Sequence, residues 1–267
     1  MKYSASLSNL RLIFRFFVIF DLNSIIKKAT IMCYSASSTS KNIDLSKKYG
    51  KKIPANLNET PVFFASGFSF PTWRIVTKAA TLQPMNWGLI PSWFKEPNFK
   101  EIASMTLNAK VETLSEKASF KQLIKRNECI IPTTGFFEWQ TKGKEKVPFF
   151  IAPSEGDMFS MAGIYDVWMH PITGEQHTTF SLLTCPANEL MEEIHTTKKR
   201  MPVLLKPEQE NDWLQGKLDL DILKTPVSSG YLKAHEVNRK LISSKSNNVP
   251  EVLLPFKNEF YAQGSLF

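Results

Sequence analysis

The chain has 267 residues, of which 43% are hydrophobic and 22% charged, and this composition excludes a wholly disordered or fibrous protein. Its three cysteines are too few for a disulfide scaffold, which favours a reducing compartment such as the cytoplasm. The net charge of +8 favours an anionic partner. We expect no membrane span, because no apolar run reaches about 20 residues.

Residues 1–32 differ in composition from the rest of the chain. They carry five basic residues and one acid, so about an eighth of the chain supplies half of the net charge of +8. No small-x-small cleavage site follows the short apolar stretch, which disfavours an export signal. We expect residues 1–32 to be an upstream extension that is absent from the mature protein. Residues 33–267 then form one domain.

The predicted elements mix strands and helices without regular alternation. Short β-branched or aromatic runs between turn residues predict strands at 62–65, 74–77, 129–132, 147–151 and 179–184. An apolar period near 3.6 residues predicts helices at 112–125, 187–195 and 207–214. This order favours the α+β class, with a mainly antiparallel, barrel-like sheet and flanking helices.

General cofactor and metal motifs are missing from the sequence. It contains no Gly-rich phosphate loop, no His-Glu-x-x-His and no Cys-x-x-Cys. The four histidines, at positions 170, 177, 195 and 235, lack the spacing of metal ligands. We therefore expect no metal and no organic cofactor.

An ordered set of segments resembles the SRAP family, the SOS response-associated peptidases. The segments follow the family order and extend over nearly all of residues 33–267: MCY (32–34), WGLIPSW (87–93), NAKVET (108–113), GFFEW (135–139), MAGIY (161–165), IH (194–195), RMP (200–202) and SNNVPE (246–251). The resemblance implies the SRAP fold. It also implies a monomeric DNA-repair protein that binds single-stranded DNA and forms a covalent thiazolidine crosslink with a ring-opened abasic site.

The resemblance makes Cys33 the amino-terminal residue after Met32 is removed. An α-amine has a pKa of about 7.7–8.0, so a useful fraction is neutral near pH 7 and can attack an aldehyde. The neighbouring thiol then closes a five-membered ring on the same carbon, and proximity makes this second attack fast. An internal cysteine has no free amine. The alternative for Cys33 is a small apolar residue at a strand edge.

Three further residues are catalytic by resemblance. Glu138 lies among aromatic residues that would raise its pKa, and it would move protons for sugar opening, Schiff-base processing and Met32 removal. His195 would assist at the abasic sugar, including strand cleavage by β-elimination. Asn108 would orient the Cys33 end. The alternatives are a solvent-facing strand carboxylate, a helix-end cap and an Asx turn, respectively.

Basic and aromatic side chains near these segments are candidates for DNA contact. Lysine and arginine would bind phosphates, and the aromatic rings would stack on bases or wedge between them. Solvated charge and core packing are the alternatives. The candidates are Lys110, Lys198, Lys199, Arg200, Trp87, Trp93 and Phe94.

The sequence departs from the commonest family pattern at the DNA-contacting positions. Tyr34 and Ser35 follow Cys33 where many members have Gly and Arg, and Lys110 replaces a more usual Arg. A lysine offers a point charge instead of a bidentate fork. Cys129 and Cys185 lie in apolar runs and are expected to be inert core thiols.

Two other function classes stay open at this level. One is a cysteine peptidase that acts in trans with Cys33, His195 and Glu138, which would cleave added peptides. The other is a non-catalytic single-strand binder, which would hold intact and abasic DNA equally well.

The start of the mature chain gives the first prediction. Intact-mass measurement of the natively expressed protein is expected to give a chain that begins at Cys33. A mass that corresponds to a start at Met1 would contradict this.

Overall fold

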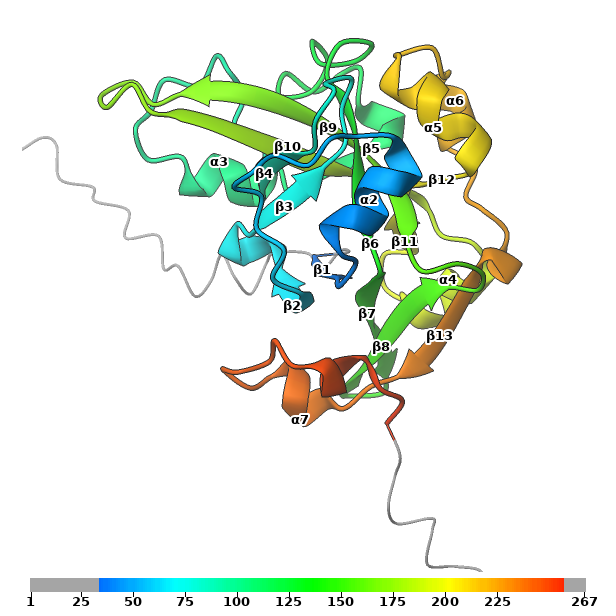
Figure 1. The fold of residues 1–267 in the computed structure, drawn as a ribbon. Helices are drawn as coiled ribbons and strands as arrows, with labels where there is room; N and C mark the ends of the chain where they lie inside the picture. The colour runs from blue at the N-terminus through cyan, green and yellow to red at the C-terminus, as the bar shows by residue number, and fades with distance from the viewer. Residues whose placement is uncertain (1–33, 257–267) are drawn as a thin grey trace, which may run out of the picture. The chain divides into compact units, whose positions relative to one another are not determined.

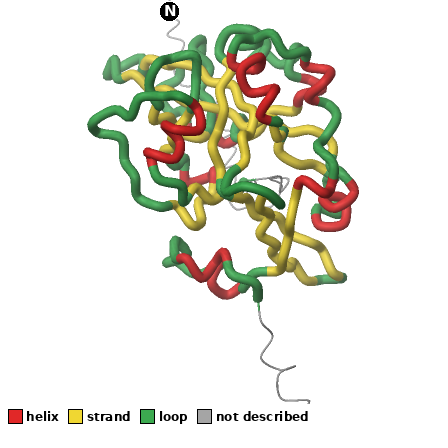
Figure 2. Tube along the Cα trace, turned by 45° about the vertical axis from the view of Figure 1, so that its right-hand side comes forward, coloured by secondary structure: helices red, strands yellow, loops and turns green. Residues whose placement is uncertain are grey.

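Strands dominate residues 34–256, the part of the chain that the computed structural model describes (Figure 1). They form two sheets, with short helices and turns around them (Figure 2). Cys33, and with it the predicted extension, lies outside the described residues.

The smaller sheet has five strands in the order β13-β8-β7-β1-β2, and all four pairings are antiparallel. Its long central strands are rich in aromatic and β-branched residues, which suit a pleated, buried surface. The strands are β1 (Ser35–Ser38), β2 (Val62–Ser66), β7 (Gly135–Lys142), β8 (Glu145–Pro153) and β13 (Leu232–Glu236).

The larger sheet has eight strands. Its main path is β12-β9-β10-β4-β3, with β6 on β9, and β5 and β11 on β10. Only β4 and β5 run parallel to β10 among the described pairings. The strands are β3 (Thr72–Ile75), β4 (Gln83–Trp87), β5 (Asn108–Lys110), β6 (Glu128–Thr133), β9 (Phe159–Met169), β10 (Gln176–Pro186), β11 (Arg200–Pro202) and β12 (Leu204–Leu205).

The helices in the described residues are short. No helix there is long and apolar enough to cross a bilayer. The α-helices are α2 (Asn42–Tyr49), α3 (Lys100–Met105), α4 (Glu189–Ile194), α5 (Pro207–Leu214), α6 (Leu220–Leu223) and α7 (Arg239–Ile242), and the 3₁₀ turns are η1 (Gly67–Ser69), η2 (Val111–Thr113), η3 (Ser229–Tyr231) and η4 (Pro250–Leu253).

The chain passes from the larger to the smaller sheet between β6 and β7. The turn at Thr134 is tied to β1, because its N–H donates to the Ser37 carbonyl oxygen at 2.8 Å. One apolar cluster then fills the space between the sheets, and includes Ala36 of β1, Phe136 of β7 and Phe159 of β9. The sheets are therefore held together by the core as well as by the covalent chain.

The predicted fold class is confirmed, since the described residues form a mainly antiparallel α+β structure. Both sheets remain open, however, so the barrel-like closure does not form. The five predicted strands fall on β2, β3, β6, β8 and β10, and two predicted helices fall on α4 and α5.

The helix predicted at 112–125 is wrong. The chain there forms η2 and a series of turns, and Lys125 has a φ of 63°. Several hydrogen bonds link residues three apart, as from Phe120 N–H to the Lys117 oxygen and from Leu123 N–H to the Phe120 oxygen. Phe120 and Leu123 are buried in the core cluster. Tertiary burial therefore explains the apolar spacing that the sequence presents as a helical period.

A tight contact in the smaller sheet gives the second prediction. A Cβ at Gly135 would lie 2.2 Å from a Phe150 ring carbon and 2.7 Å from the Ile151 oxygen. Gly135→Ala should therefore lower the free energy of unfolding by about 1–3 kcal/mol through overpacking. Urea denaturation measures the free energy of unfolding. Gly230→Ala is the control, since a Cβ at Gly230 meets nothing within 4 Å. Equal stability of the two variants would contradict the packing argument.

Candidate active site

Glu138 lies in the middle of β7, between β1 and β8. Ser35 of β1 pairs with Phe137, and Phe149 of β8 pairs with Glu138 itself. Both edges of β7 are therefore paired at this point; residues 135–138 are all buried, and Glu138 is 0% exposed. Alternation along the strand therefore does not turn this carboxylate toward solvent.

His195 reaches Glu138 from α4. The helix begins at the cap Asn188, whose side-chain oxygen accepts the N–H of Met191, and His195 follows its last residue. The imidazole is 1% exposed, and its Nδ1 lies 3.8 Å from Oε1 of Glu138. The structure thus joins two predicted site residues that lie far apart in the sequence.

The Arg200 carbonyl oxygen fixes the proton on the His195 ring. It accepts a hydrogen bond from His195 Nδ1 at 3.0 Å. Because a carbonyl oxygen can only accept, Nδ1 carries the proton. In the neutral ring Nε2 is then the acceptor nitrogen. The chain between His195 and Arg200 folds back on itself, since Lys199 N–H donates to the His195 oxygen at 3.0 Å.

The Arg200 side chain binds inside the protein. Its guanidinium pairs through two nitrogens with the Glu112 carboxylate, and Nη2 also donates to the Thr184 oxygen at 2.6 Å. Arg200 is 9% exposed. This internal pairing competes with the phosphate contact predicted for Arg200. The guanidinium instead connects β11 to Glu112 and to β10.

Asn108 is placed by β5, which runs parallel to the middle of β10. Leu182 pairs with Asn108 and Thr184 with Lys110. Asn108 is therefore a buried strand residue, and the Asx-turn alternative does not describe it. Lys110 is exposed. The same segment continues to Glu112, so β5 and η2 bring this motif beside Arg200.

The remaining DNA-contact candidates divide by exposure. Trp93 is 48% exposed and Phe94 is partly buried. Trp87 is only 3% exposed, stacks against Phe180 with ring centroids 6.1 Å apart, and donates its indole N–H to the Leu107 oxygen. This placement favours core packing for Trp87. Lys198 and Lys199 are exposed, and Lys199 pairs with Glu192 at 3.0 Å.

The two described cysteines are buried. Burial raises the pKa of the Cys129 thiol well above its ordinary value, with a further contribution from the charge of Glu128. It raises the pKa of Cys185 to about 12. Since the thiolate is the nucleophile, neither thiol is reactive near neutral pH.

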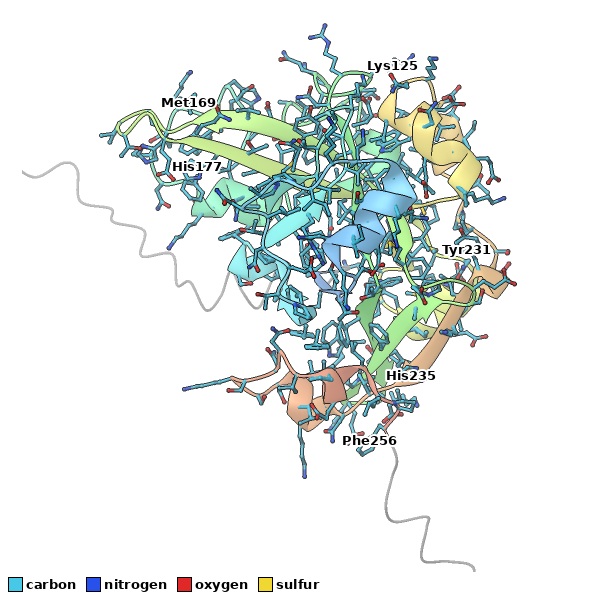
Figure 3. All side chains as sticks on the ribbon, viewed as in Figure 1. Lys125, Met169, His177, Tyr231, His235 and Phe256 are labelled. Carbon is cyan, nitrogen blue, oxygen red and sulfur yellow. The ribbon has the colours of Figure 1, made fainter. Side chains whose placement is uncertain are left out.

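The histidines do not gather at one place. Figure 3 shows His177 near Met169 at the far end of the β9–β10 hairpin, and His235 on β13. Within residues 34–256 no group of three or more His, Cys, Asp or Glu side chains could hold a metal ion.

Comparison with known proteins identifies the family. Residues 32–244 match the sequence model of the SOS response associated peptidases, SRAP. The chain belongs to the SRAP family.

Its curated relatives include proteins named for abasic sites. "Abasic site processing protein YoqW" of Bacillus subtilis is 38% identical over 177 residues, which cover 64% of this chain and 75% of the relative. YoaM of the same species, also named an abasic site processing protein, is 34% identical over 207 residues, or 72% of this chain and 88% of the relative. "Abasic site processing protein HMCES" of Xenopus tropicalis is 32% identical over 193 residues, and 56% of that longer relative is covered.

The fold also has close solved neighbours. A crystal structure of a protein from Bacteroides thetaiotaomicron superposes with a TM-score of 0.79 at 35% identity, covering 84% of this chain and 100% of that one. The two-sheet architecture is therefore that of a solved relative of substantial sequence identity.

Glu112 is the site residue that the sequence did not single out, although it lies in the SRAP segment of Asn108 and Lys110. Asn108, Lys110 and Glu112 follow one another at two-residue spacing, and this spacing is the sequence signal that could have identified Glu112. Burial works to raise the pKa of Glu112, but hydrogen bonds and the charge of Arg200 outweigh it and hold the pKa below its usual value. The Arg200 pair therefore favours the charged form of the carboxylate.

This depressed pKa gives the third prediction. A group of this kind stabilises the folded state above its unfolded pKa, near 4.3, and the contribution is lost as the pH falls through the folded pKa. Glu112→Gln should therefore be clearly less stable than wild type at pH 6–7, and the difference should shrink below about pH 4. Urea midpoints across this range measure it, with exposed Glu155→Gln as the control. A constant difference across the range would contradict the assignment.

Proposed function

We propose that this SRAP protein processes abasic sites in single-stranded DNA by covalent capture at Cys33, after Met32 has been removed. One observation carries the proposal: a buried histidine lies 3.8 Å from a buried glutamate on β7, the strand that pairs with β1, and β1 begins two residues after Cys33. The names of the curated relatives support the substrate class.

Chain connectivity supports the role of Cys33. Ser35 pairs with Phe137, the residue before Glu138. Consecutive Cα atoms are 3.8 Å apart, so two residues span at most about 7 Å. A mature chain that begins at Cys33 would therefore present its α-amine and thiol within reach of the Glu138 region.

The proposed reaction balances without a cofactor. The Cys33 amine adds to the aldehyde carbon of the ring-opened sugar, and loss of one water gives an imine. The thiol sulfur then bonds to the same carbon while its proton passes to the nitrogen, which closes the thiazolidine ring. Proximity makes the second step effectively unimolecular.

Glu138 and His195 would move the protons of this sequence. Sugar opening, water loss and hydrolysis of the Met32–Cys33 bond each need a group that gives and takes a proton. Glu138 is buried beside an imidazole whose Nδ1 proton is held by the Arg200 oxygen. The internal Glu112–Arg200 pair would then act as a positioning element for His195.

DNA contacts would come from the exposed candidates. Lys110, Lys198 and Lys199 would bind phosphates, and Trp93 and Phe94 would contact bases. Trp87 would support this surface from the core, since its indole is buried.

Substitution of Cys33 tests the proposal directly. A chain that starts at Met32 is incubated with an oligonucleotide containing one abasic site and run on a denaturing gel. Wild type should give a heat-stable shifted band, and Cys33→Ala should give none, because both nucleophiles must sit on one residue. Cys185→Ala is the control, since that buried thiol is not a competitor. An undiminished band from Cys33→Ala would refute capture at this residue.

Substitution of Glu138 tests proton transfer separately. Glu138→Gln keeps the shape of the side chain but removes the acid and base, so capture should slow by about 100-fold or more. The rate is followed by quenching samples onto the same gel, after mass measurement shows that Met32 is gone. Glu155→Gln should match wild type. A wild-type rate for Glu138→Gln would assign the proton transfers to another group.

A further inference from the structure

Phe68 is an exposed aromatic residue just after β2 of the smaller sheet, and its ring contacts Tyr34, the residue before β1. It occupies the middle of η1 and is 44% exposed. Its ring centroid lies 4.8 Å from that of Tyr34, and the two planes are tilted by 55°. An exposed ring beside a candidate site offers a flat apolar surface on which another ring can stack.

The backbone holds η1 in one place. Gly67 N–H donates to the Tyr34 oxygen at 2.7 Å, and Phe70 N–H donates to the Gly67 oxygen at 2.9 Å. The Ser69 hydroxyl donates to the Ser66 oxygen at 2.7 Å. Phe70 closes the turn with a φ of 50°, a conformation that is uncommon for a bulky residue. The Phe68 ring therefore stands on a turn that is fixed to the strand.

Close packing also ties η1 to the Asn108 segment. A Cβ at Gly67 would lie 3.1 Å from a Leu107 methyl carbon and 3.3 Å from the Trp87 indole. Glycine thus lets the turn sit against Leu107, the residue before Asn108. The Tyr34–Phe68 pair consequently lies beside the Asn108 segment, and Tyr34 is itself the residue that follows Cys33.

We propose that the Tyr34–Phe68 pair is a stacking platform for the nucleobase next to the abasic sugar. This inference rests on the proposed function and names a specificity surface of the same site. A base beside an abasic position has lost its stacking neighbour, and an aromatic side chain can replace it for any base, because every base has a π-face. Tyr34 stands where the family pattern has Gly, so this chain carries a ring at a position where that pattern has no side chain.

The test separates stacking from capture. The probe is an oligonucleotide with a tetrahydrofuran abasic analogue, which has no aldehyde, and 2-aminopurine as the adjacent base. Stacking on the platform should quench its fluorescence. Titrations use the full chain and the chain that starts at Met32, in wild type, Phe68→Ala, Phe68→Tyr and Phe256→Ala. Phe256 is 42% exposed and lies after β13, so it is a matched control.

Phe68→Ala should bind about tenfold more weakly and lose most of the quenching. Phe68→Tyr and Phe256→Ala should behave as wild type, and thermal melting shows whether each variant is folded. Wild-type affinity and quenching in Phe68→Ala would overturn the platform.

The covalent assay distinguishes this result from failure of the proposed function. If wild type captures a natural abasic strand but Phe68→Ala quenches normally, only the platform is wrong. If wild type forms no heat-stable product, the proposed function fails. Absence of any binding to the analogue by wild type would overturn the platform as well.

Discussion

The site depends on one buried contact, between the Glu138 carboxylate and the imidazole of His195 at 3.8 Å. A carboxylate removed from water is costly unless other groups stabilise it. Glu138 is 0% exposed, so solvent does not supply that stabilisation. The His195 imidazole lies beside this carboxylate, and the Arg200 carbonyl oxygen determines which nitrogen of the ring carries the proton.

Both sheets contribute to this contact. The smaller sheet carries Glu138, and the larger sheet carries Arg200, whose carbonyl oxygen binds His195, on a short strand that pairs with β10. The core cluster between the sheets holds them in a fixed position relative to each other. A change in the packing of either sheet would consequently alter the position of the His195 imidazole, because α4 contacts both β7 and β11.

Side-chain type alone did not decide which candidates face solvent. Arginine at 200 is typical of a phosphate contact, yet its guanidinium is engaged by Glu112 and Thr184. Tryptophan at 87 is typical of a stacking residue, yet it fills the core against Phe180. In both cases the side chain contacts a residue that is distant in sequence. Phe68, which no pattern singled out, is exposed, as is the predicted contact residue Trp93.

The sequence by itself determined the family, the α+β class, five strands and two helices, because ordered motifs and short-range apolar patterns are written along the chain. It also put Glu138, His195 and Asn108 forward as one site. Only the tertiary structure decided that Glu138 is buried, that its partner is the Nδ1 side of His195, and that Glu112 holds Arg200. These facts depend on strand pairing and burial between residues up to 88 positions apart. Local propensity carries no information about such distant contacts, and for the same reason the apolar spacing at 112–125 produced turns instead of a helix.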